Sequence, residues 1–232
     1  MQELGWHGVT LVLFFSLPLI AFALYARFTD IPTALIFSNL QISILRMTIA
    51  YTVSAFLGWL CAVLFYKGNV ARIALPFFDV LQSIPTYAAL PLAVALLGPS
   101  DLVVVLFLVL AIIWPIFFSV VSTLKLLKPE WEEAVEMSDL RGFEYVKKFL
   151  WPASTPGLIT GSIIGLGDGW EALIATEIIV KSPQGLGTFF NTYSQNSVVT
   201  TFGIVCFLVL IFSINKLVWL PLLERSHRMH EE

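Results

Sequence analysis

The sequence predicts an all-α fold: a polytopic membrane protein with six transmembrane helices and one long cytoplasmic loop. Of its 232 residues, 58% are hydrophobic and 12% are charged, and the mean hydropathy is +0.86. A soluble domain needs about a quarter of its residues charged, so this composition excludes an ordinary soluble protein. Apolar runs of about 20 residues recur along the chain, and a run of that length satisfies its own backbone hydrogen bonds in lipid as a helix.

Six apolar runs are long enough to cross the hydrocarbon core. They cover residues 9–26, 42–66, 73–97, 102–124, 157–180 and 199–223. We expect 9–26 to be a retained helix, because no basic segment precedes it and no small-residue cleavage site follows it. The chain is therefore expected to form a single transmembrane domain over 1–232, with its core at 40–223 and its cytoplasmic loop at 125–156.

The distribution of lysine and arginine predicts that both termini lie in the cytoplasm. Positive side chains accumulate in cytoplasmic loops because they resist translocation. With six spans, one side of the membrane would carry Lys67, Arg72, Lys125, Lys128, Arg141, Lys147, Lys148, Lys216, Arg225 and Arg228. The opposite side would carry only Arg27, Arg46 and Lys181. The first set shares its side with both termini and with the loop 125–156.

The loop 125–156 is the longest polar stretch between two spans. Six of the 16 acidic residues fall between Glu130 and Glu144. Pro129 and the carboxylates after it favour a short helix over 130–137. Ser138 or Asp139 is expected to cap a second, amphipathic helix over 140–151, which Pro152 and Pro156 would end. The alternative is a solvated connection with no partner.

This loop contains a short motif, Glu-Ala-Val at 133–135, followed at 149–152 by Phe-Leu-Trp-Pro. The motif resembles the EAA loop of the inner-membrane permease subunits of binding-protein-dependent ABC importers, which have I-x-L-P at the second position. Asp139 stands where the family has a glycine, and Gly142 follows three positions later. Asp139 can supply an N-cap at the bend that a glycine would otherwise allow.

The resemblance extends over most of the chain after Asn39. The segment SIPTYAALPL at 83–92 resembles the proline-containing third span of the family. Trp170, Ala-Thr-Glu at 175–177 and Gly-Leu-Gly at 185–187 resemble the end of its fifth span. These features are most like the branch that handles nitrate, sulfonates, taurine, bicarbonate or pyrimidine-type vitamin precursors.

The resemblance implies a permease subunit that forms the solute path and is coupled to a separate ATP-binding subunit through residues 129–152. It further implies a solute-binding protein outside the cytoplasmic (inner) membrane and a second permease subunit, expected to be an identical chain. The lipid membrane is the remaining partner, and no nucleic acid is expected. The residues implied to contact the ATP-binding subunit are Glu133, Ala134, Asp139, Gly142 and Phe143.

Catalytic and metal-binding constellations are missing from the sequence. The three histidines, His7, His227 and His230, lie near its ends, so none can hold a buried metal or pair with an intramembrane acid. No G-x-x-x-x-G-K-[ST] run is present to bind nucleotide phosphates. We expect no enzyme activity, no metal and no cofactor on this chain, with ATP held by the partner subunit.

Four glycines recur every fourth residue in the fifth predicted span: Gly157, Gly161, Gly165 and Gly169. A face without side chains allows close approach of another helix. That helix would belong to the same subunit or to the second permease. Prolines 76, 85, 91 and 115 interrupt the third and fourth spans, and they would act as hinges or as simple kinks.

Two acidic residues, Asp168 and Glu171, lie roughly 16 to 21 Å along the fifth span from Gly157, near the membrane midplane. Intramembrane acids tend to face a cavity or a partner, so we expect them to border the solute path. Pro85, Trp170 and Glu177 complete the predicted path or gating residues. Two ionised carboxylates would repel an anion, which favours a neutral or cationic solute. The alternatives are packing roles and an ion-coupled secondary transporter that uses Asp168 and Glu171.

Overall fold

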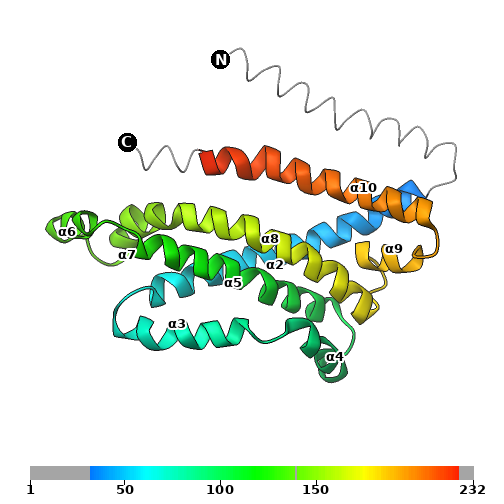
Figure 1. Cartoon of the computed structure of the whole chain (residues 1–232), viewed down its shortest axis with the longest axis horizontal. Helices are drawn as coiled ribbons and strands as arrows, with labels where there is room; N and C mark the ends of the chain where they lie inside the picture. Colours follow the sequence, from blue (N-terminus) through cyan, green and yellow to red (C-terminus); the bar gives the residue numbers. More distant parts are fainter. Residues whose placement is uncertain (1–31, 139, 225–232) are drawn as a thin grey trace, which may run out of the picture.

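The computed structural model describes residues 32–138 and 140–224, and this part of the chain is an elongated bundle of helices without strands (Figure 1). The all-α prediction is confirmed for these residues. The first predicted span, 9–26, lies outside them.

Three long helices form the centre of the bundle. They are α2 (Thr33–Phe65), α5 (Asp101–Lys125) and α8 (Trp151–Val180), with α5 packed against both of the others (Figure 1). The helix α10 (Ser197–Ile214) continues through a π-helical turn, and the whole segment Ser197–Glu224 is long and apolar enough to cross a membrane. α2 and α5 are also long and apolar enough to cross a membrane. Buried aliphatic and aromatic side chains fill the core between the packed helices.

The third predicted span, 73–97, is two helices instead of one. α3 (Gly68–Gln82) and α4 (Thr86–Leu97) meet at an angle of 77°. Pro85 lies at the break with ψ 97°, in an extended conformation, which leaves it unable to continue α3 and without an N–H to donate. Pro76 and Pro91 lie inside their helices, so only Pro85 marks a sharp change of direction here.

The predicted helix end at Pro152 and Pro156 is wrong. α7 (Gly142–Tyr145), the π-helical turn η1 (Val146–Leu150) and α8 follow one another without a gap. In η1 the Trp151 N–H donates to the carbonyl of Val146, five residues back. This wider turn precedes Pro152, where an ordinary α-turn would bring the proline ring against a carbonyl.

The described residues contain fewer helices that qualify as membrane spans than the six predicted. Three helices meet the length and composition expected of a membrane span, or four if α3 and α4 are taken as one broken span. α8 carries Asp168, Glu171 and Glu177 and is not among them, although its 30 residues give it a length of about 45 Å. The predicted count of six is therefore not confirmed.

The loop between α5 and α8 contains the first of the two predicted short helices. α6 (Pro129–Met137) agrees with the expected 130–137. The next helix begins at Gly142 and not at 140, and Gly142 adopts a left-handed φ of 57°. Ser138 Oγ donates to the Val135 carbonyl at 2.8 Å, so it closes α6 and does not cap the following helix as predicted. Asp139 lies outside the described residues.

The short helix α9 (Leu186–Thr192) lies in the stretch predicted as a polar outer loop. It is at the end of the bundle opposite α6 and α7 (Figure 1). The two ends are therefore chemically distinct: one carries the charged loop and the other carries α9.

The regularly spaced glycines of α8 face α5 of the same chain. A Cβ atom on Gly161 would lie 2.6 Å from Ile116 Cα, and one on Gly157 would lie 2.6 Å from the Ser119 carbonyl oxygen. A Cβ atom on Gly165 would lie 2.9 Å from the Ile112 carbonyl oxygen, whereas one on Gly169 would lie 2.8 Å from the end of the Ile112 side chain. At 157, 161 and 165 these distances leave no room for a side chain, so the two backbones pack in direct contact there.

We predict that Gly161→Ala lowers the free energy of unfolding by about 1 to 3 kcal/mol, because the added methyl group meets α5 backbone that cannot move away. The matched control is Gly167→Ala on the same helix, where a Cβ atom would have nothing within 4 Å. That control should be neutral or slightly stabilising, since alanine favours helix more than glycine does. Thermal unfolding of the purified proteins in detergent measures both, and equal midpoints would contradict the packing account.

Candidate functional site

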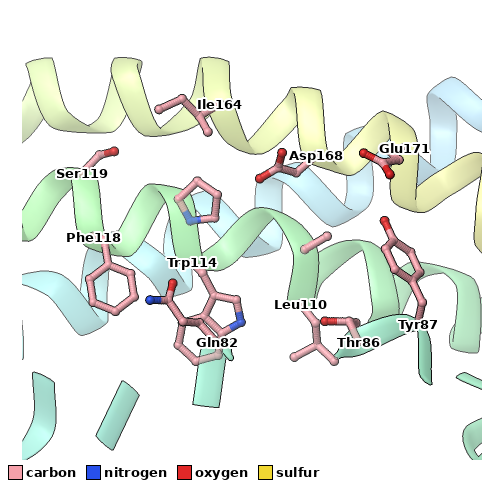
Figure 2. A pocket seen from close by; sticks show the side chains of 12 residues that line it. Gln82, Thr86, Tyr87, Leu110, Trp114, Phe118, Ser119, Ile164, Asp168 and Glu171 are labelled. Atoms are coloured by element: carbon pink, nitrogen blue, oxygen red, sulfur yellow. The ribbon is translucent and has the colours of Figure 1, made fainter. Parts of the chain in front are cut away.

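A cavity of about 530 Å³ lies between α8, α5 and the break that joins α3 to α4 (Figure 2). It is open on one side of the chain. The described residues that line it are Gln82, Thr86, Tyr87, Leu110, Ala111, Trp114, Pro115, Phe118, Ser119, Ile164, Asp168 and Glu171. The bend at Pro85 places the end of α3 and the start of α4 at this cavity, so the broken helix forms one of its walls.

The α8 wall of the cavity carries both acidic side chains. Ile164, Asp168 and Glu171 follow the i, i+4, i+7 spacing that places residues on one face of a helix. Tyr87 of α4 points its hydroxyl group towards Glu171 across the cavity (Figure 2). Neither carboxylate has an ion-pair partner among the described residues, and both are exposed in the single chain.

Trp170 does not join these two acids, although we predicted it as a path residue. Successive helical residues are turned by about 100°, which directs Trp170 to another face of α8. It is buried against α10, where its ring and that of Phe207 lie 5.2 Å apart in an edge-to-face arrangement. Pro85 does not line the cavity itself but sets the position of Thr86, the residue that does. The position of Trp170 in the helical repeat already predicts, from the sequence alone, that it lies on a different face of the helix from Asp168 and Glu171.

Glu177 lies in a buried ion cluster near the end of α8. Arg46 of α2 donates from Nη1 to Glu177 Oε1 at 2.6 Å and from Nη2 to Asp101 Oδ1 at 2.5 Å. The Glu177 side chain is fully buried, whereas Asp101 is mostly exposed. Sequence reasoning assigned Arg46 no role beyond orientation. The available signal was an arginine inside an apolar run, since a buried charge requires a partner.

The same carboxylate anchors the start of α9. Glu177 Oε2 accepts from the Gly187 N–H at 2.8 Å, and Ser43 Oγ donates to Oε1 at 2.8 Å. Gly185 adopts φ 139°, and a Cβ atom there would lie 2.4 Å from the Glu177 carboxyl group. The Gly-Leu-Gly motif thus lets the chain fold directly onto Glu177. This geometry ties α2, α8 and α9 together.

The residues predicted to contact an ATP-binding subunit lie at the opposite end of the bundle. Glu133 in α6 is exposed, and so is Gly142 at the start of α7. Phe143 exposes 78% of its surface and Met137 exposes 88%. Ala134 lies within α6, and Asp139 is outside the described residues. Large apolar side chains on a polar loop are typical of a contact surface.

Comparison with known proteins places this arrangement in a family. Residues 54–220 match the family described as binding-protein-dependent transport system inner membrane component, and this range includes the α3–α4 break, the cavity, α6, α7 and all of α10. The chain belongs to this family. It is therefore related to the permeases of ABC importers, and it is a multi-pass protein of the inner membrane.

Several curated members of the family are similar to this chain. The nitrate import permease protein NrtB of Synechocystis sp. is 28% identical over 148 residues, which are 63% of this chain and 54% of the relative. The bicarbonate transport system permease protein CmpB of Synechococcus elongatus is 24% identical over 158 residues, 67% of this chain and 57% of the relative. The putative aliphatic sulfonates transport permease protein SsuC of Bacillus subtilis is 24% identical over 178 residues, which are 75% of this chain and 64% of the relative. The matches thus span between half and two thirds of each relative.

We predict that Glu177→Gln lowers the free energy of unfolding by about 3 kcal/mol, because it leaves the buried Arg46 with one carboxylate fewer. The matched control is Glu144→Gln, which removes a carboxylate from an exposed pair with Lys148 at 3.2 Å. Such pairs contribute about 0.3 to 0.5 kcal/mol. Thermal unfolding in detergent should separate the two variants clearly. If both lost the same small amount, the ion cluster would not stabilise the fold.

Proposed function

We propose that this chain is the permease subunit of an ATP-binding-cassette importer, with its solute path beside α8 and its coupling surface on α6 and α7. The observation that carries the proposal is the family match over 54–220, which includes both regions. No catalytic set is needed for this role: ATP would be bound and hydrolysed by a separate subunit, and the chain itself would hold no cofactor.

The open side of the cavity supports assembly with a second permease. Asp168 and Glu171 face outward from the single chain, and unpaired carboxylates directed at lipid would be costly. A second copy placed against this face would enclose both acids in an aqueous path between the subunits. We expect a homodimer, because one chain supplies all the elements of this face.

The two ends of the bundle support two different partners. The end with α6 and α7 exposes Phe143 and Met137, which suit a groove on an ATP-binding subunit. The lysines and arginines near this end favour a cytoplasmic position for it. The opposite end, with α9, would then receive a solute-binding protein. In this arrangement 9–26, α2, the α3–α4 pair, α5, α8 and α10 make six spans, with both termini cytoplasmic.

The continuous helix through α7, η1 and α8 provides a mechanical connection between the two sites. It runs from Gly142, next to Phe143, to the residues Asp168 and Glu171 at the cavity. Displacement of one end of an unbroken helical segment would be transmitted along it to the other end. Closure of the ATP-binding subunits would therefore shift the cavity wall directly.

A secondary transporter that uses Asp168 and Glu171 for ion coupling is the alternative function. It is favoured only by the presence of two acids in one cavity. Uptake into proteoliposomes distinguishes the two: an importer requires the ATP-binding subunit and ATP hydrolysis, whereas a secondary transporter would work alone on an ion gradient. Uptake by the isolated chain on such a gradient would overturn our proposal.

We predict that Phe143→Asp abolishes copurification of the ATP-binding subunit, because a charge would replace an exposed apolar contact. The control, Phe143→Leu, keeps an apolar side chain and should retain most of the bound subunit. Since Phe143 is exposed in the single chain, neither variant should change the thermal unfolding midpoint of the permease alone. Retention of the ATP-binding subunit by Phe143→Asp would exclude this residue from the interface.

A further inference from the structure

We propose that the path beside α8 carries an organic cation, and not an anion of the kind named for the relatives. This inference rests on the proposed transport function and adds the chemical class of the solute. It is drawn from the charge and the side-chain chemistry of the cavity together. Nitrate, bicarbonate and aliphatic sulfonates, the solutes in the relatives' names, all carry negative charge at neutral pH.

The ionisable groups of the cavity are acidic. Asp168 and Glu171 project from one face of α8 into it (Figure 2), and its lining contains no lysine, arginine or histidine among the described residues. A third acid, Asp79, does not line the cavity but accepts a hydrogen bond at 2.6 Å from Nε2 of Gln82, which does. A cleft lined by charge of one sign concentrates ions of the opposite sign and excludes those of the same sign.

The one buried arginine of the described helices makes its hydrogen bonds outside the cavity. Arg46 donates to Glu177, Asp101 and Ser182 and does not line the cavity. It therefore supplies no positive charge to an anion in the path. If a second copy faces the first, four carboxylates from the two chains would border the same space.

Aromatic side chains form the wall opposite the acids. Trp114 and Phe118 of α5 and Tyr87 of α4 line the cavity, and Figure 2 shows them across from Asp168 and Glu171. The faces of aromatic rings attract cations, most strongly when the cation is poorly hydrated, as an alkylammonium group is. A cavity with carboxylates on one side and aromatic rings on the other suits an amine-bearing organic cation.

The charge preference of the cavity can be measured with a cysteine reporter. In a background with Cys61→Ala and Cys206→Ala, Ser119→Cys places a thiol in the cavity lining, and Ser194→Cys places one on the exposed segment after α9. Each variant is purified in complex with the ATP-binding subunit. Both are labelled with the cationic methanethiosulfonate ethyltrimethylammonium reagent and with the anionic ethylsulfonate reagent. The ratio of the two rates at position 119 is then divided by the ratio at position 194.

We predict that the normalised ratio of cationic to anionic labelling rates is on the order of ten. In the double variant Asp168→Asn with Glu171→Gln, this ratio should fall towards one. A second arm keeps both carboxylates: benzyltrimethylammonium should slow labelling at position 119, whereas benzenesulfonate, of similar size and opposite charge, should not. A normalised ratio near one with the carboxylates present, or better protection by benzenesulfonate, would overturn the cation proposal. It would mean that residues outside this face neutralise the acids.

The same preparation separates this inference from the proposed function. Labelling at position 119 is repeated with ATP and with a non-hydrolysable analogue. If nucleotide changes the labelling rate but the charge ratio is near one, the importer role stands and the cation proposal fails. If the charge ratio is high and nucleotide has no effect, the cavity selects cations but is not coupled to the ATP-binding subunit.

Discussion

The direct packing of α8 on α5 is the constraint on which the rest of the molecule depends. Gly157, Gly161 and Gly165 bring the two backbones into contact along the first half of α8, and Gly169 packs against the side chain of Ile112. Only then can the neighbouring face of α8, with Asp168 and Glu171, border the same cavity as Trp114 and Ser119 of α5. A side chain at Gly157, Gly161 or Gly165 would meet the α5 backbone and push α8 outward, which would open the wall of the cavity. Small residues at helix contacts supply this kind of close fit in membranes, where the hydrophobic effect between helices is weak.

α8 links three regions that differ in their chemistry. Its start continues from α7 beside the exposed loop, its middle carries the cavity acids, and its end carries Glu177. The Arg46–Glu177 pair fixes that last part to α2 and α9, so this end of α8 is held while the end that continues from α7 remains accessible to a partner. In the proposed importer, a push on Phe143 would therefore tilt α8 about an anchored end. The cavity lies between the point of force and the anchor.

The sequence predicts the parts of this fold that depend on local patterns. The apolar runs locate α2, α5 and α10, the four-residue period of glycines identifies a packing face, and the carboxylates after Pro129 indicate α6. Contacts between distant residues escaped prediction: Arg46 and Glu177 are 131 positions apart, and no pattern pairs them. The helix through Pro152 was also missed, because proline usually ends a helix and a π-helical turn has no sequence signal of its own. The acids of the cavity were identified, but their aromatic counterparts Tyr87 and Trp114 come from other helices and could only be found in the structure.

The central claim is that one face of α8 borders a solute path while the loop before α7 rests on an ATP-binding subunit. An electron cryo-microscopy structure of the permease with that subunit tests both halves at once. The account predicts α6 and Phe143 seated in the ATP-binding subunit, with Asp168 and Glu171 of two permease copies facing a shared aqueous space. A structure with these two carboxylates turned to lipid, or with α6 free of the ATP-binding subunit, would contradict it.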